Sequence, residues 1–265
     1  MPEEGEVAIP LNNDVVPEGT IISYSENELG GEDVSGKIAE FTKNIDALRF
    51  GITKKVGGEN EIEEAQMYVE THIDDMLSLC LGPDESSSQA LRNVYLTLLC
   101  SHLTENEPLR LRVGEYFLSD SKRVESLVTN TVSENSLHVF ASLYHGAKDV
   151  EKDELEEVLA QNINVFDPYL EKGDLRFALT FLDSLSGRTS SPRAQQFRTY
   201  LEDKMDIITR HLSAEDLSQS EQIFDLAKKL YGAEEGKIHR YLDLLGSSTE
   251  ILLKGFSEGK FSDEL

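Results

Sequence analysis

Apolar residues recur at intervals of three and four along most of the chain from residue 36 onward, and this spacing constrains the fold most strongly. Side chains three and four residues apart lie on one face of an α-helix, so each such segment predicts an amphipathic helix of roughly ten to twenty residues. No comparable strand alternation occurs in the sequence. The clearest stripes run over residues 62–80, 91–102, 137–144, 175–185, 197–212 and 223–231.

Candidate helix starts fall between these stripes. The pairs Asp167-Pro168 and Ser191-Pro192 each place a capping side chain before a proline at the first helical position. The segment from Ser213 to Asp216 has the form of a capping box. These signals predict helices that begin at each of the three sites.

Two prolines, Pro83 and Pro108, recur as Pro168 and Pro192 after about 85 residues, and half of that interval is about the length of an armadillo repeat. A stack of such repeats buries a continuous apolar stripe. We therefore predict an all-α, armadillo/HEAT-like right-handed superhelical solenoid of about four repeats. A compact helical bundle is the alternative.

The two ends of the chain differ from its centre. Residues 1–35 carry nine acidic residues, no Lys or Arg, and three prolines, which is typical of an extended or disordered leader. Glycines and lysines between residues 254 and 260 predict a flexible tail. The expected organisation is an acidic leader over 1–35, a helical repeat domain over 36–253 and a tail over 254–265.

The chain has 50 acidic and 25 basic residues, a net charge of −25. Binding to nucleic acid or to an anionic membrane needs a basic surface, so we expect neither partner. No apolar run reaches the ~18 residues of a membrane span, so we expect no membrane insertion. A solvated acidic surface accounts for the charge, and a basic protein partner is the alternative.

The two cysteines, Cys80 and Cys100, fall on apolar helix stripes. If residues 61–80 and 86–103 form an antiparallel hairpin, a rise of ~1.5 Å per residue separates the cysteines by roughly 18 Å. A disulfide needs Cα atoms within ~7 Å. We predict two buried free thiols.

Motifs of catalysis are missing from the sequence. It contains no phosphate-binding loop, no HExxH, no EF-hand loop and no nucleophile elbow. His138 and His145 lie seven residues apart and can share a helix face, but a metal site needs further ligands at matching spacing. We expect the histidines on solvated faces or at helix ends; they are His72, His102, His138, His145, His211 and His239.

Acidic clusters have a structural interpretation. Glu61, Glu63 and Glu64, and the cluster from Asp153 to Glu157, are assigned to first helical turns, where carboxylates complement the helix dipole. We expect no enzyme activity, and no catalytic, cofactor-binding or metal-binding residues. A metal-dependent hydrolase that uses the scattered histidines is a further alternative.

The last four residues, Ser262, Asp263, Glu264 and Leu265, resemble a KDEL-type retrieval signal, which a receptor binds at a free C-terminus. This predicts the lumen of the endoplasmic reticulum and a retrieval receptor as partner. The first six residues are neither basic nor apolar, so they contain no signal peptide and by themselves indicate the cytoplasm. The cytoplasm is therefore the alternative location.

Residues 98–128 resemble the fungal Sil/Sls family of nucleotide exchange factors for BiP, the lumenal heat-shock chaperone. The shared pattern is a helix, an Asn-x-Pro-Leu turn from Asn106 to Leu109, and a further helix around 121–128. The helix at 61–80 and the segment 15–20 are also similar in character. The resemblance covers about half of the chain.

The resemblance implies a monomer that grips the nucleotide-binding domain of BiP and promotes release of ADP, assisting protein translocation and folding. No cofactor is implied, and no contact residues can be carried over, so the partner-binding residues stay unknown. The alternative function is a cytosolic helical-repeat scaffold that has no effect on the nucleotide state of its partners.

Overall fold

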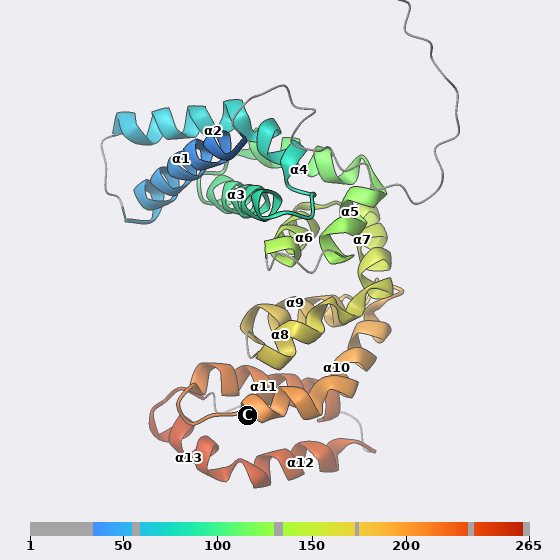
Figure 1. Ribbon diagram of the computed structural model, residues 1–265. Helices are drawn as coiled ribbons and strands as arrows, with labels where there is room; N and C mark the ends of the chain where they lie inside the picture. The colour runs from blue at the N-terminus through green and yellow to red at the C-terminus, as the bar shows by residue number, and fades with distance from the viewer. Residues whose placement is uncertain (1–33, 55–58, 130–134, 173–174, 233–235, 262–265) are drawn as a thin grey trace, which may run out of the picture. The chain divides into compact units, whose positions relative to one another are not determined.

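The computed structural model describes residues 34–54, 59–129, 135–172, 175–232 and 236–261, and within these ranges all regular structure is helical (Figure 1). The predicted all-α class is confirmed. The leader up to residue 33 and the retrieval-like residues 262–265 lie outside the described residues. The helices are α1 Val34–Lys54, α2 Glu59–Leu79, α3 Glu85–Leu103, α4 Glu107–Leu118, α5 Ser121–Thr129, α6 Asn135–Gly146, α7 Asp149–Gln161, α8 Asp167–Lys172, α9 Leu175–Gly187, α10 Ala194–Ile208, α11 Leu217–Tyr231, α12 Ile238–Ser247 and α13 Thr249–Ser257, with 3-10 turns η1 Ile163–Phe166 and η2 Thr209–His211.

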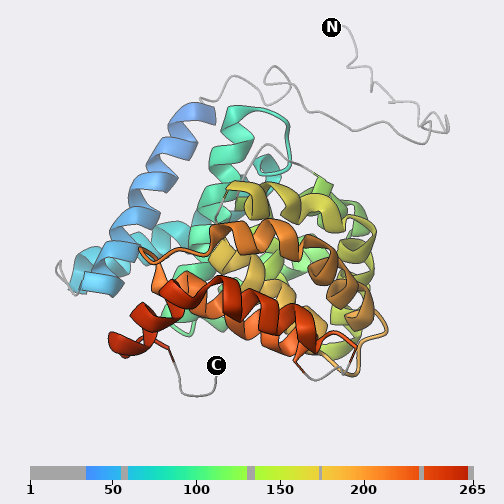
Figure 2. The ribbon, with the colours of Figure 1, turned by 90° about the horizontal axis from the view of Figure 1, so that it is seen from below.

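The closest helix packing joins neighbours along the chain. Helix α2 packs on α3, α3 on α4, α9 on α10, and both α12 and α13 pack on α11 (Figure 2). A longer step is made from α3 to α6, three helices further on. Helix α1 joins this arrangement through side chains, because Asn93 Nδ2 of α3 donates a hydrogen bond to Thr42 Oγ1 at 3.0 Å. Local packing of this kind is typical of repeat proteins.

The predicted apolar stripes form the core. On α2, the stripe residues Ala65, Val69, Ile73 and Met76 are each at most 4% exposed. Burying these side chains in a helix that is polar on its other side explains why α2 forms against α3. Among the described residues, no helix has both the length and the apolar character that crossing a membrane requires.

Two of the predicted helix starts are wrong by a few residues. Helix α11 begins at Leu217, because Asp216 Oδ1 accepts from Gln219 N at 3.0 Å, whereas Ser213 Oγ accepts only from Glu215 N. Helix α10 begins at Ala194, and Ser191 lies in the preceding turn. In both cases a side chain that suits a helix cap makes a local turn instead.

Two other capping signals mark helix starts. Asp167 is the first residue of α8 and follows η1 directly. Asn106 is the N-cap of α4 and accepts from Leu109 N at 3.2 Å, and Pro108 lies in the first helical turn. The Asn-x-Pro-Leu segment is therefore the start of a helix rather than a turn between helices.

Both cysteines are free and buried, as predicted. Burial raises the pKa of the Cys80 thiol to about 12 and that of the Cys100 thiol to about 11. Only the thiolate reacts at an appreciable rate, so both side chains are protected twice, by packing and by protonation.

We expect this protection to slow thiol modification at neutral pH by at least about 100-fold relative to the denatured chain. The measurement is the rate of colour release from a disulfide reagent in native buffer and in denaturant. Two equivalents should react promptly only in denaturant. Prompt reaction of one equivalent in native buffer would show that a cysteine is accessible.

The chain after residue 253 differs from the predicted flexible tail. Helix α13 continues to Ser257, and Phe261 is 6% exposed. The Phe261 ring packs edge-on against Phe224 of α11 and Phe256 of α13, with centroids 5.8 Å away in both cases. The predicted boundary is therefore wrong, because an aromatic anchor lies directly before residue 262.

Gly255 makes room for this anchor, since a Cβ there would lie 2.3 Å from the Phe261 ring. We expect Gly255→Ala to displace the ring and lower the free energy of unfolding by about 1–2 kcal/mol. This value is the burial energy lost when the Phe ring is exposed, reduced by the higher helix propensity of Ala over Gly. Gly114→Ala in α4 is the matched control, because no atom lies within 4 Å of its Cβ position. That variant should gain up to about 1 kcal/mol. Urea denaturation measures both, and equal shifts would rule out the anchor.

Candidate partner-binding site

Helix α6 presents two histidines on one side. His138 and His145 are seven residues apart, as two turns of helix require, and both rings contact phenylalanines of α9. The centroid of His138 lies 4.0 Å from that of Phe177, and the centroid of His145 lies 5.9 Å from that of Phe181. The expectation that these histidines share a face is confirmed. Their packing against aromatic rings was not expected.

Helix α3 extends the same surface on the other side of α6. Tyr95 lies 5.1 Å, centroid to centroid, from His138. One and two turns further along α3, Leu99 and Leu103 are 36% and 51% exposed. His102 lies beside them and is also exposed. We name this surface the α3–α6–α9 face and define it as Tyr95, Leu99, His102, Leu103, His138, His145, Arg176, Phe177, Thr180 and Phe181.

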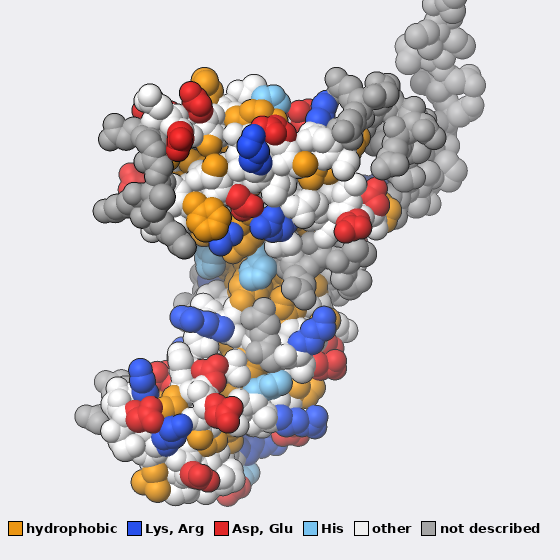
Figure 3. Space-filling view, turned by 60° about the vertical axis from the view of Figure 1, so that its left-hand side comes forward, with side chains coloured by type: hydrophobic (Ala, Val, Ile, Leu, Met, Phe, Trp, Pro, Cys, Tyr) orange, Lys and Arg blue, Asp and Glu red, His pale blue; other side chains and the backbone are white. Residues whose placement is uncertain are grey.

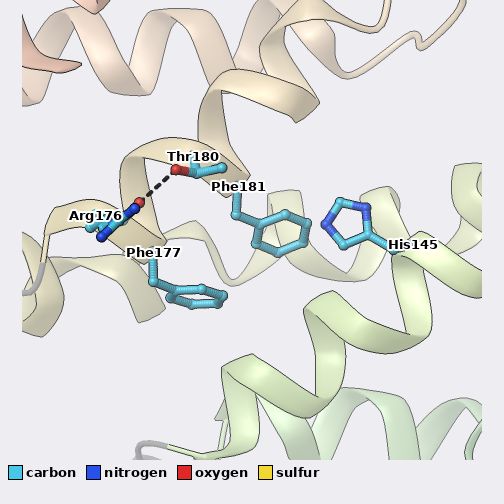
Figure 4. A pocket seen from close by; sticks show the side chains of 5 residues that line it. All are labelled: His145, Arg176, Phe177, Thr180 and Phe181. Atoms are coloured by element: carbon cyan, nitrogen blue, oxygen red, sulfur yellow. Dashed lines mark hydrogen bonds between the residues drawn. The ribbon is translucent and has the colours of Figure 1, made fainter. Parts of the chain in front are cut away.

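A pocket of about 320 Å³ lies where α6 meets α9. Phe177 and Phe181 form its aromatic part, with centroids 6.1 Å apart and near-parallel rings. In Figure 4 the rings of Phe181 and His145 point toward one another from the two helices. Arg176 and Thr180 line the pocket from the exposed side of α9. Thr180 Oγ1 donates a 2.7 Å hydrogen bond to the carbonyl oxygen of Arg176.

Two histidines of this face, His102 and His145, are biased toward their neutral forms. Burial lowers the pKa of His102, and the nearby charges of Arg110 and His145 lower it further. Partial desolvation lowers the pKa of His145, and Lys152 adds to the effect. Arg110 Nη1 lies 3.2 Å from His102 Nδ1, and because a guanidinium only donates, that nitrogen is the acceptor. At neutral pH these two rings are therefore largely uncharged.

In Figure 3, histidine and hydrophobic side chains lie side by side on one face of the molecule, with basic and acidic side chains around them. A patch with an apolar and aromatic centre and a charged border is typical of a protein-binding surface. Tyrosine, arginine and phenylalanine are also the residue types that such surfaces favour.

A buried ionic network supports this face from behind. Glu156 is fully buried and accepts hydrogen bonds from Tyr144 Oη at 2.6 Å, from Arg188 Nη1 at 2.8 Å and from Ser191 Oγ. The bond to Glu156 raises the pKa of Arg188, and burial raises the pKa of Tyr144. The network connects α6, α7 and the loop between α9 and α10. It therefore fixes the helices that carry the pocket.

The first-turn interpretation of the cluster from Asp153 to Glu157 is wrong, because all of its acidic residues lie beyond the first turn of α7. Helix α7 begins at Asp149, so Glu156 lies two turns inside it, beyond the reach of the helix dipole. Glu61 lies in the first turn of α2, which begins at Glu59, whereas Glu63 and Glu64 lie in the second turn. The sequence contains the partners of a buried carboxylate, Arg188 and Ser191, close together in one later loop. No sequence pattern, however, pairs these two residues with Glu156.

Two histidines outside the face, His72 and His211, have structural contacts. His72 stacks on Tyr68 with centroids 4.1 Å apart, and His211 Nε2 lies 2.8 Å from the carbonyl oxygen of Leu170. No three His, Cys, Asp or Glu side chains within the described ranges are placed to hold a metal ion. The predicted site residues Ser262, Asp263, Glu264 and Leu265 lie outside the described residues.

Sequence reasoning missed Phe177 and Phe181. The stripe assigned to this helix used Leu175, Leu182 and other aliphatic residues, and the two rings four residues apart were the available signal. Comparison with protein-family models, with curated proteins and with solved structures finds no match to this chain.

Proposed function

We propose that this chain is a reversible protein-binding module that acts as a nucleotide exchange factor for BiP, the lumenal heat-shock chaperone. The observation that carries the protein-binding part is the α3–α6–α9 face, where Leu99, Leu103 and Phe177 expose apolar surface beside uncharged histidines. The choice of partner is supported by the resemblance of residues 98–128, which form the end of α3, then α4 and α5, to the exchange-factor family.

Exchange needs only differential binding. A protein that binds the open, nucleotide-free form of a chaperone more tightly than the closed form weakens the nucleotide by the same factor. A preference of ~3 kcal/mol weakens ADP by ~150-fold. No proton transfer or covalent step takes part, so the proposal requires a shaped surface and no catalytic residues.

In finer detail, we propose an armadillo-like solenoid of right-handed superhelical form. The supporting contacts repeat at intervals of three helices: α3 packs on α6, and the rings of α6 contact those of α9. Armadillo repeats contain three helices, and the third helix of each repeat contributes to one shared surface. The α3–α6–α9 face is such a surface.

We also propose residence in the endoplasmic reticulum, with Ser262–Leu265 bound by a retrieval receptor, and a monomeric state. The support for the location is the sequence of these four residues. Deleting them should cause secretion without changing exchange activity in a purified assay, because the α3–α6–α9 face does not include them. Loss of exchange on deletion would contradict this separation.

The test of function is release of a fluorescent ADP analogue from BiP, measured by stopped flow with and without the protein. We expect release to accelerate and to saturate with concentration. The variant Leu103→Glu places a charge on the α3–α6–α9 face and should abolish most of the acceleration. Leu253→Glu on α13 is the matched control, since Leu253 is 67% exposed and lies on another surface.

An unchanged release rate at saturating protein would overturn the exchange-factor proposal. If BiP still binds without any change in release, a scaffold that does not affect nucleotide state becomes the better description. If Leu253→Glu and Leu103→Glu lose activity equally, the α3–α6–α9 face is not the binding surface.

A further inference from the structure

We infer that the pocket between α6 and α9 receives one large hydrophobic side chain of a partner protein, and that Arg176 pairs with a carboxylate next to it on the partner. The inference rests on the proposed function only in taking the ligand to be part of a protein. It adds the chemistry that the partner must present at this point.

The size and the aromatic lining of the pocket favour a hydrophobic side chain as its ligand. Its volume of about 320 Å³ lies at the small end of binding pockets and suits a single large side chain better than an extended ligand. Phe177 is half-buried and stacks beside Phe181, so one ring is available to a ligand while the other is held in the core. Tyr169 of α8 supports Phe177 from behind, with centroids 6.0 Å apart.

Arg176 favours a carboxylate next to that hydrophobic side chain. Its side chain is exposed at the pocket, and across the described ranges no carboxylate lies within salt-bridge distance of its guanidinium. The next arginines along the chain differ: Arg188 and Arg193, which lie between α9 and α10, and Arg198 in α10 each pair with a carboxylate. Among the described residues, the Arg176 guanidinium is therefore available to a carboxylate of a partner. Its planar donors match a carboxylate in a paired geometry.

The same observations disfavour other ligands. Among the described residues that line the pocket none is acidic, so a cationic side chain would find no ion-pair partner there and would be repelled by Arg176. A phosphate-rich ligand needs several cations around it, and this lining offers one arginine. A hydrophobic side chain without a neighbouring acid would leave Arg176 unused and gain only from the rings.

The test uses three small probes of nearly equal size: 3-phenylpropionate, 3-phenylpropanol and 3-phenylpropylamine. Each is titrated into the full chain labelled with ¹³C at histidine and phenylalanine rings, and ring signals of His145 and Phe177 are followed by NMR. We expect the acid to bind about fivefold more tightly than the alcohol, the ratio that one exposed ion pair supplies. The amine should bind most weakly.

Two variants test the carboxylate contact and the aromatic contact separately. Arg176→Gln should remove the preference for the acid and leave alcohol binding unchanged. Phe177→Ala should weaken all three probes by about tenfold, because it removes the accessible ring. Arg210→Gln is the matched control, an exposed arginine outside the pocket, and it should change nothing.

Equal binding of acid and alcohol, preferred binding of the amine, or no ring perturbation up to the solubility limit of the probes would each overturn the inference. The outcome is separable from that of the exchange assay. If BiP releases nucleotide but the pocket does not select the acid, the ligand class is wrong and the function stands. If the pocket selects the acid but BiP does not respond, the function is wrong and the pocket stands.

Discussion

Replacing Glu156 by alanine is expected to lower the free energy of unfolding by about 3 kcal/mol, the low end of the cost of breaking a buried ion pair. The change leaves three groups without their shared acceptor: the Tyr144 hydroxyl, the Ser191 hydroxyl and one edge of the Arg188 guanidinium. The low end applies because the Arg188 side chain is 16% exposed and also lies near Asp149 and Asp153. The shift of the urea midpoint, with the slope held constant, measures the loss.

The matched control is the next residue. Glu157 pairs with Arg193 at the surface, where both side chains are about two-fifths exposed. Glu157→Ala should cost no more than about 1 kcal/mol, because exposed ion pairs contribute little. The two variants remove the same side chain from adjacent positions of α7. A small effect at Glu156, equal to that at Glu157, would mean that the buried network does not brace the helices.

The second large effect is expected for Phe181→Ala, at about 3–5 kcal/mol. Phe181 is 2% exposed, and its ring lies within 6.3 Å, centroid to centroid, of the rings of Phe140, Tyr144 and Phe166. Truncation opens a cavity between α6 and α9, which surrounding rings cannot collapse to fill. Thermal and urea unfolding of the purified variant measure the loss.

Two further substitutions make the cause of this loss testable. Phe181→Leu keeps most of the volume and should cost less than about 2 kcal/mol. Phe50→Ala removes the same ring from a position that is 49% exposed and should cost about 1 kcal/mol or less. A loss at Phe181 no larger than at Phe50 would show that the aromatic cluster does not hold α6 to α9.

How far the sequence predicts this molecule depends on the feature. The helical period identified α2, α3 and α11 closely, because an apolar stripe three and four residues apart has one structural interpretation. The predicted helix starts were wrong where a polar side chain could either cap a helix or make another hydrogen bond. Ser191 and Ser213 suit helix caps, but the first donates to Glu156 and the second closes a turn, and only the folded partners decide between these roles.

The candidate site illustrates the same limit. The spacing of His138 and His145 predicted a shared face, since it follows from helix geometry alone. Which helix they meet depends on packing between segments that are distant along the chain, and no local pattern points from α6 to Phe177. The burial of Glu156 was missed for the same reason, because its partner Arg188 lies 32 residues further along the chain, in the loop after α9.

The most direct test of the account is the affinity of this protein for the nucleotide-binding domain of BiP in two states, nucleotide-free and saturated with ADP. Isothermal titration at one salt concentration gives both values. Differential binding predicts that the nucleotide-free domain binds about 150-fold more tightly, and that ADP affinity falls by the same factor when this protein is bound. Equal affinities for the two states would contradict the account, since a protein that binds both forms alike cannot expel the nucleotide.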